Sequence, residues 1–221
     1  MKFKTIAFML SACFALFCFA SCDLGLSKKE YVPTGEEYFS FSLTENGTYA
    51  ISAKDVNNLP TQVNLPKEYE GKSVTEIAED GFIGASITKV VVPEGYTVIG
   101  DMAFKDCASL KTVSLNSVKK IGNHAFYGCN VLSAVEFPTA LEEIGGFAFS
   151  DTAVTTVKLV KVKTIGKYAF YGCKSLKNLY IPSTTVSIGE KAFDGVNAKI
   201  NVEVSSANEY YKAEGNNVVS K

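Results

Sequence analysis

One pattern, Ile-Gly-x-x-Ala-Phe, recurs along the chain at nearly constant intervals and constrains its fold more than any other feature. Successive isoleucines lie 21 to 23 residues apart, and a phenylalanine follows each of them five residues later. A catalytic motif has no reason to occur six times at one interval, whereas stacked repeats require such a period. The period therefore predicts a repeat solenoid. Its repeats, numbered one to six, contain Ile77/Phe82, Ile99/Phe104, Ile121/Phe126, Ile144/Phe149, Ile165/Phe170 and Ile188/Phe193.

A pair of apolar residues two positions apart follows each phenylalanine, for example Val113 and Leu115 in repeat two. Alternation of this kind predicts a short strand with one buried face. Proline directly follows the pair in three repeats and ends the pairing, because it has no amide hydrogen to donate. One repeat cannot bury its phenylalanine alone, but a stack of six buries a continuous core. We therefore expect six repeats of 21–23 residues over residues 74–204.

The longer pattern I-G-x-x-A-F-x-G-C-x-x-L-x-x-V-x-L-P resembles the leucine-rich repeat of the BspA type. Repeat three carries it nearly whole, from Ile121 to Pro138, and the resemblance covers about three fifths of the chain. It implies a solenoid of short parallel β-strands, one per repeat, linked by turns and short helical segments. Repeats one and four are each one residue short after the phenylalanine and lack the cysteine. Their coils are expected to be tighter or offset.

The first residues resemble a bacterial lipoprotein signal. A basic start is followed by an apolar stretch over residues 5–21, with small residues directly before Cys22. The resemblance implies a signal peptide at residues 1–21, a lipidated Cys22 and a tether over residues 22–37. An ordinary secretory signal or a signal anchor is the alternative. The lipoprotein interpretation predicts an exported, membrane-anchored protein at the cell surface, on the outer membrane.

Both ends of the repeat array are expected to carry caps, because an open solenoid end exposes apolar groups and unpaired strand edges. The stretch FSFSLTENGTYAIS, residues 39–52, alternates around Asn46-Gly47, a strong hairpin-turn signal, and residues 38–73 are therefore assigned to an N-terminal β-hairpin cap. Residues 205–221 are assigned to a C-terminal cap.

No residue pattern of the chain indicates catalysis. The G-x-S-x-G elbow, the Walker phosphate loop and the H-E-x-x-H zinc motif are absent from the sequence. His124 is the only histidine, and the matching position varies freely among the other repeats, which favours a solvent-exposed role. A net charge of −1 argues against a nucleic-acid partner. We therefore expect no enzymatic activity, no metal and no cofactor.

Three cysteines, Cys107, Cys129 and Cys173, share one repeat position. Cys107 and Cys129 stand on adjacent coils, where a disulfide is geometrically allowed. A ladder of small buried thiols that fill the core is the favoured interpretation.

The outward positions of the strands form the candidate binding face, because solenoids recognise partners on side chains that the core does not need. A sheet of six strands is only about 30 Å long, and a stable interface needs about 800 Å² per partner. We therefore expect weak binding by one molecule, with avidity from many copies. The candidate residues are Lys89, Thr112, Ser114, Glu136, Thr156, Lys158, Asn178 and Tyr180.

Two further features leave alternatives open. Tyr127, Phe147, Tyr168 and Tyr171 gather around the Ala-Phe turns, either as packing between coils or as a partner surface. Residues 158–167 carry four lysines in ten positions, which suits either an acidic partner or a solvated patch beside nearby acids.

The resemblance to BspA-type proteins implies attachment to host matrix proteins or to other bacteria. The expected function is a non-catalytic, lipid-anchored adhesion module that recognises a protein or glycan on host or neighbouring cells. The alternative is a structural or accessory lipoprotein that faces the periplasm within an envelope complex.

Overall fold

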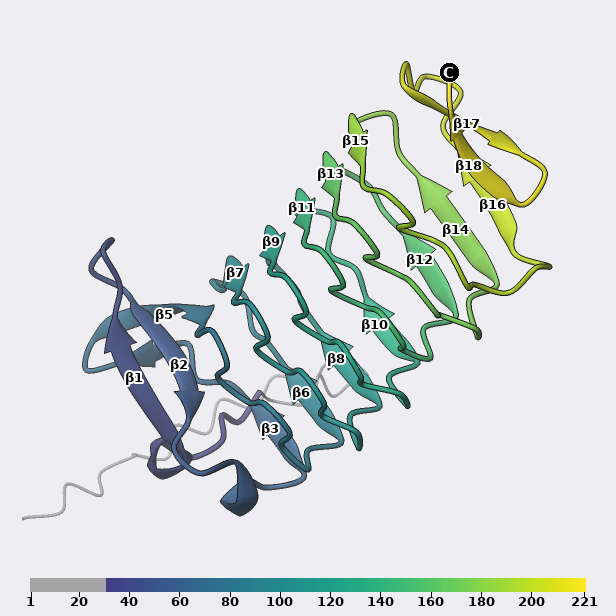
Figure 1. The fold of residues 1–221 in the computed structure, drawn as a ribbon. Coiled ribbons are helices and arrows are strands. Elements are labelled where there is room, and N and C mark those ends of the chain that lie inside the picture. Colours follow the sequence, from purple (N-terminus) through teal and green to yellow (C-terminus); the bar gives the residue numbers. More distant parts are fainter. Residues whose placement is uncertain (1–30) are drawn as a thin grey trace, which may run out of the picture. The chain divides into compact units, whose positions relative to one another are not determined.

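The computed structural model describes residues 31–221, which form one compact unit with its own core. The predicted signal peptide and the predicted lipidation site, Cys22, lie outside the described residues, as does most of the tether. The described chain winds into stacked coils, each contributing two short strands (Figure 1). The predicted repeat solenoid is therefore confirmed.

The first ladder of strands is built around the repeat isoleucines, which are register partners of one another from Ile77 to Ile188. These strands are parallel, and the antiparallel hairpin β1–β2 extends the sheet at its N-terminal edge. The sequence predicts one strand per repeat, at the apolar pair. The strands of this first ladder are an additional strand in each repeat that the sequence analysis does not predict. Its members are β1 (Phe39–Leu43), β2 (Tyr49–Ala53), β4 (Glu68–Tyr69), β5 (Lys72–Ile77), β7 (Val98–Ile99), β9 (Lys120–Ile121), β11 (Glu143–Ile144), β13 (Thr164–Ile165) and β15 (Ser187–Ile188).

The second ladder contains the predicted apolar pairs and is split into two sheets. In the described chain, no pairing joins β10 to β12, so the ladder is interrupted between repeats three and four. It also starts before the first predicted repeat, within the segment assigned to the N-terminal cap. One sheet holds β3 (Gln62–Asn64), β6 (Lys89–Val91), β8 (Thr112–Ser114) and β10 (Ala134–Glu136), and the other holds β12 (Thr156–Lys158), β14 (Asn178–Ile181) and β16 (Asn201–Val204).

We attribute the interruption to a change in repeat length. Ile144 and Val157 lie 13 residues apart in repeat four, whereas Ile121 and Val135 lie 14 apart in repeat three. Repeat one is as short as repeat four, but the repeat that follows it is longer, and β6 still pairs with β8. Among the repeats, the length falls only from repeat three to repeat four. The expected offset is therefore found at repeat four, while repeat one remains paired.

The hydrogen bonds before the strands follow the same interruption. The Ser133 amide donates to the Lys111 carbonyl at 3.2 Å, and the Lys177 amide donates to the Thr155 carbonyl at 2.8 Å. The corresponding amide of Thr155 donates to no described backbone group. The coils nevertheless stay stacked there, because β11 pairs with both β9 and β13.

The phenylalanines form a continuous stack through the core. From Phe82 to Phe193, consecutive rings lie nearly parallel with centroids 5.1–5.5 Å apart, which matches the spacing of the coils. The first five are fully buried. The alanine before each ring, where present, leaves room for the neighbouring coil, so the repetition of Ala-Phe has a packing cause.

The three cysteines lie beside this stack with buried, free thiols, as the buried-thiol interpretation predicts. Cys107, Cys129 and Cys173 each donate to a phenylalanine carbonyl of the preceding coil at 3.1 Å. Burial raises the pKa of Cys173 to about 11. In repeat four Thr152 takes the equivalent position, where its hydroxyl donates to the Phe149 carbonyl at 2.8 Å.

The turn between the isoleucine and the phenylalanine holds one non-glycine residue in the left-handed region in every repeat. This conformation is strained for most side chains, which makes its sixfold recurrence informative. The left-handed residues have φ between 53° and 58° and are Asp80, Met102, His124, Phe147, Tyr168 and Lys191.

The repeat strands are linked by turns rather than by the expected helical segments. The two helices of the described chain are single 3₁₀ turns before repeat one, η1 (Glu36–Tyr38) and η2 (Val56–Asn58).

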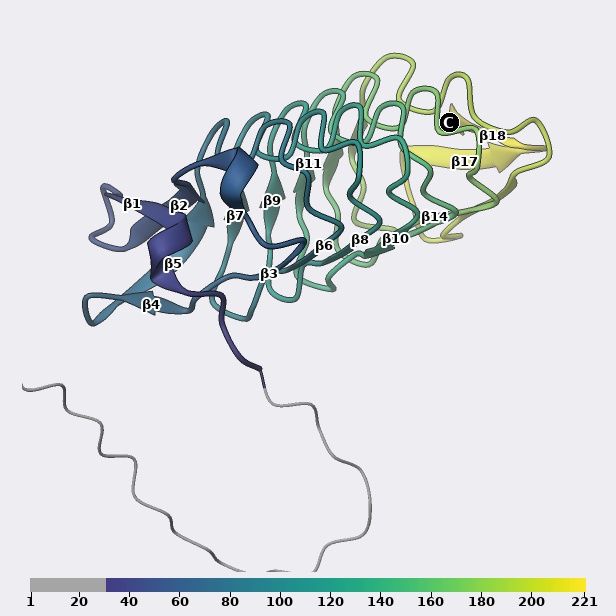
Figure 2. The same ribbon diagram turned by 90° about the horizontal axis from the view of Figure 1, so that it is seen from below.

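The C-terminal end is covered by a hairpin of β17 (Tyr211–Glu214) and β18 (Asn217–Ser220). Figure 2 shows this hairpin at the opposite end of the stack from β1 and β2. The Tyr211 hydroxyl accepts a hydrogen bond from the Ile188 amide at 2.8 Å, so a side chain satisfies the edge of the last strand of the first ladder. Within residues 31–221, no helix has the length and apolar character to cross a membrane.

Candidate binding surface

The eight candidate residues lie on the outer side of the second ladder, alternating with the buried residues of each strand. The interruption of the ladder divides them between the two sheets. Lys89, Thr112, Ser114 and Glu136 belong to the sheet of β3, β6, β8 and β10, and Thr156, Lys158, Asn178 and Tyr180 belong to the sheet of β12, β14 and β16.

The surface is hollowed over the second of these sheets. A depression of about 600 Å³ lies over β12, β14 and β16. A smaller one of about 390 Å³ lies at the interruption, between Glu136 and Phe137 on one side and β12 on the other. The two share Thr156, Lys158 and Val160, so they form one depression, which we call the C-terminal groove. Its polar side chains on the paired strands are Thr156, Lys158, Asn178, Tyr180, Asn201 and Glu203.

Strand register arranges these polar side chains in two rows. Thr156, Asn178 and Asn201 are successive partners across the three strands and form the first row. Lys158, Tyr180 and Glu203 form the second row in the same way. The sequence indicates the outward direction of these side chains. It gives no sign of the hollow over these strands.

The lysines of residues 158–167 divide into two kinds. Lys163 pairs with Glu142 at 2.5 Å, and Lys167 pairs with Glu190 at 2.8 Å. The hydrogen bond from Lys163 lowers the pKa of Glu142. Lys158 and Lys161 form no ion pair with any described residue. The interpretation as a solvated patch beside acids fits Lys163 and Lys167. The interpretation as a surface for an acidic partner remains for Lys158 and Lys161.

The aromatic residues at the turns form a second, outer stack. His124, Phe147 and Tyr168 lie on successive coils with centroids 4.8 Å apart, all in the left-handed turn position. They are half-buried, so His124 is less exposed than the sequence predicts. Tyr127 and Tyr171 meet this stack edge-on. Because the stacked rings cover one another's faces, the arrangement supports packing between coils more than ligand binding.

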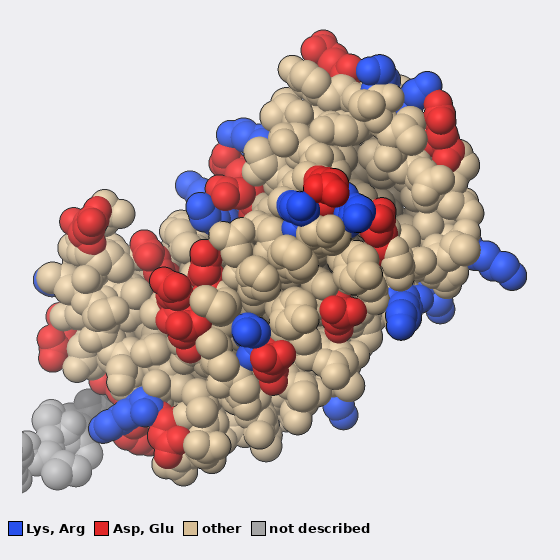
Figure 3. Space-filling model, in the orientation of Figure 1, with Lys and Arg blue, Asp and Glu red and all other residues tan. Residues whose placement is uncertain are grey.

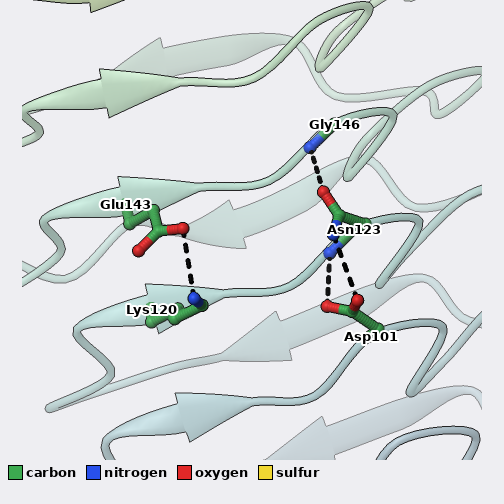
Figure 4. Close-up of polar contacts among 5 residues, drawn as sticks. All are labelled: Asp101, Lys120, Asn123, Glu143 and Gly146. Atoms are coloured by element: carbon green, nitrogen blue, oxygen red, sulfur yellow. Dashed lines mark hydrogen bonds and ion pairs between the residues drawn. The ribbon is translucent and has the colours of Figure 1, made fainter.

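Polar side chains also join neighbouring coils on the turn side. Asp101 accepts from the Asn123 amide at 2.8 Å, and the Asn123 side-chain oxygen accepts from the Gly146 amide at 2.8 Å (Figure 4). Lys120 and Glu143 pair at 3.2 Å on adjacent strands of the first ladder. These groups satisfy backbone donors and exposed charges. In the described part of the chain, no three His, Cys, Asp or Glu side chains are grouped to hold a metal.

Charge is distributed unevenly along the solenoid. Residues 31–115 carry 12 Asp and Glu against 6 Lys, and residues 116–221 carry 9 against 12. Figure 3 shows acidic side chains clustered over the turns near β5 and β7. The groove therefore lies in the more basic half of the molecule.

The family comparison matches the chain to the model described as the BspA type leucine rich repeat region. It finds six copies, over residues 57–165 and 97–213. No curated protein matches the chain.

Solved structures share the fold. A leucine-rich repeat protein of T. pallidum is 23% identical, with a TM-score of 0.60 over 80% of this chain and 90% of its own. A leucine-rich cell surface protein of Faecalibacterium prausnitzii is 25% identical, with a TM-score of 0.67 over 88% of this chain and 60% of its own. The chain thus spans less than two thirds of the second protein.

Proposed function

The chain belongs to the BspA-type leucine-rich repeat family, and we propose that it is a non-catalytic binding and adhesion module displayed on a bacterial cell. Its repeat surface recognises a protein or glycan on host or neighbouring cells. Lipidation of Cys22 holds it on the outer membrane. Two or more acyl chains anchor a protein stably, which a single chain does not.

The C-terminal groove is the observation that carries this proposal. It is a concave surface lined by side chains that the core does not use, and such surfaces are where solenoids bind their partners. The similar protein of Faecalibacterium prausnitzii is described as a cell surface protein, which supports the same location here.

Each molecule is expected to bind weakly. The chain contains no Trp and no Arg, the residues that dominate many tight interfaces together with Tyr. Many copies on one cell compensate, because the second and later contacts occur at a high effective concentration.

Protease treatment of intact cells tests the location. A non-permeant protease is expected to remove the protein from intact cells, with lysed cells as the control for susceptibility. The Cys22→Ser variant is expected to appear in the medium or in the soluble fraction. Protection on intact cells together with digestion after lysis would contradict surface display and favour the periplasmic alternative.

Adhesion is tested with cells that carry or lack the protein, on surfaces coated with matrix proteins or glycans. We expect attachment to rise steeply with the number of copies per cell, because many weak contacts together give a high overall affinity. Equal attachment of the two strains on every surface would contradict an adhesive role.

A further inference from the structure

We propose that the C-terminal groove binds a carbohydrate that carries a carboxylate, such as a uronic or sialic acid residue within an oligosaccharide. This inference rests on the proposed function and names the ligand class of the same surface.

The size and lining of the groove fit a short oligosaccharide. A depression of about 600 Å³ lies within the range of about 300–1,000 Å³ typical of small-ligand sites. The row Thr156, Asn178 and Asn201 presents one hydroxyl and two amides, which both donate and accept hydrogen bonds. Sugar hydroxyls need both kinds of partner. The Tyr180 ring adds an apolar surface beside this row.

Charge favours an acidic sugar over a neutral one. Lys158 lies within the groove and Lys161 three residues beyond it, and neither pairs with a described acidic side chain. Lys177 and Lys199 are exposed one and two residues before the start of β14 and β16, respectively, and neither lines the groove. Two glutamates also line the depression, and each accepts a hydrogen bond from a neighbouring side chain: Glu136 from Ser114 at 3.5 Å and Glu203 from Asn201 at 3.4 Å. A carboxylate near Lys158 therefore meets a lysine that lines the groove and pairs with no described acidic side chain.

An extended peptide inserted as a strand does not fit the interruption. Room for an additional strand between β10 and β12 requires two strand spacings, about 9.6 Å. Coils three and four keep the spacing of a single coil in the core, where the rings of Phe126 and Phe149 lie 5.1 Å apart, and at the first ladder, where β9 pairs with β11. A strand therefore cannot enter between the two coils, and the ligand lies across the strands on the outer surface.

Titration calorimetry on the purified full chain tests the proposal with three probes: a uronic acid-containing tetrasaccharide, sialyllactose and neutral lactose. We expect a Kd on the order of 1 mM or below for at least one acidic probe. Binding of lactose is expected to be at least about 10-fold weaker, which corresponds to one charge-assisted contact. The two acidic probes distinguish a uronic from a sialic acid.

Variants locate the binding. Lys158→Gln and Tyr180→Ala are each expected to weaken the acidic probe by about 10-fold or more. Lys174→Gln, which changes an exposed lysine outside the groove, is the matched control and is expected to bind like the wild type. Thermal unfolding at the wild-type midpoint confirms that each variant is folded.

Three results would overturn the inference: no binding of either acidic probe, equal binding of lactose, or unchanged binding by folded Lys158→Gln. Cell attachment separates this failure from that of the proposed function. If cells with Lys158→Gln attach as well as wild-type cells, the protein is still an adhesin, but the groove is not the site by which it attaches. If the purified protein binds an acidic probe but cells that carry it do not attach, the groove is a binding site and the proposed adhesive function is contradicted.

Discussion

The two ladders of the solenoid respond differently to the same short repeat. The first ladder runs without interruption from β5 to β15, and the phenylalanine stack beside it keeps its spacing throughout. The second ladder loses its pairing between β10 and β12. Both ladders pass through repeat four, so its length alone does not decide the outcome.

The difference shows how a stacked protein accommodates a missing residue. The first ladder is fixed on one side by the buried rings and on the other by glycines that lie closely against the backbone of the preceding coil. The outer ladder is packed on one face only, and its other face is exposed to solvent. The missing residue is therefore accommodated at the outer ladder, where the pairing between β10 and β12 is lost.

The largest test of this comparison removes a ring from the stack. Phe149→Ala is expected to lower the free energy of unfolding by about 3–5 kcal/mol, because it leaves a cavity between two parallel rings. Phe137→Ala, at the interruption, is the matched control and should cost clearly less, because Phe137 is only partly buried. Urea unfolding measures both. Equal losses would show that the two faces are equally rigid.

A smaller effect is expected at the glycines of the first ladder. A Cβ on Gly166 would lie 2.4 Å from the Gly146 nitrogen, a backbone atom that has no free space to move into. Gly166→Ala should therefore cost about 2 kcal/mol or more. On Gly146 the nearest contact is 3.3 Å, so Gly146→Ala serves as the control. A fully folded Gly166→Ala with unchanged stability would contradict the close contact.

The thiols beside the stack predict a dependence on pH. The pKa of Cys173 rises from 9.0 to about 11 on folding, so the unfolded chain loses this proton first. Unfolding therefore becomes easier as the pH increases from 9 to 11, by up to about 2 kcal/mol from this group. Cys173→Thr, which copies Thr152 of repeat four, should show a shallower decline. The idea fails if the two proteins lose stability in parallel.

The smallest expected effect comes from restoring the missing residue. One Asn inserted after Ala153 gives repeat four the length of repeat three and is expected to let β12 pair with β10. Each regained hydrogen bond contributes about 0.5–1.5 kcal/mol, less the cost of ordering the added residue. Hydrogen exchange detects the change more directly, as slower exchange of the Thr155 amide. A Thr155 amide that is already as protected as that of Lys177 would count against the interruption.

The sequence predicts the repeats well because large buried side chains recur in them at nearly constant intervals. The spacing of Phe82 to Phe193 gives the number of coils, and the apolar pairs give the strands of the second ladder. The first ladder is missed because its strands are two residues long and end at a glycine, which reads as a turn. The matching isoleucines were its available signal.

The groove and the left-handed turns lie beyond such reasoning. Residues as different as Asp80, Phe147 and Lys191 occupy the same turn position, so no residue preference reveals its backbone conformation. The part of the groove at the interruption lies where two consecutive repeats differ in length. The shorter repeat four is visible in the sequence, but only the packing of the coils decides which face separates.

The interruption between β10 and β12 also has a mechanical consequence. If the proposed ligand is held in the groove and the proposed anchor holds Cys22, the ligand pulls on repeats four to six and the anchor resists through repeats one to three. The load then crosses the coil boundary that lacks the hydrogen bonds of the outer ladder. A coil of 22 residues that detaches releases about 70 Å of chain. Under flow, this boundary is where the molecule would yield first and lengthen, instead of releasing its ligand.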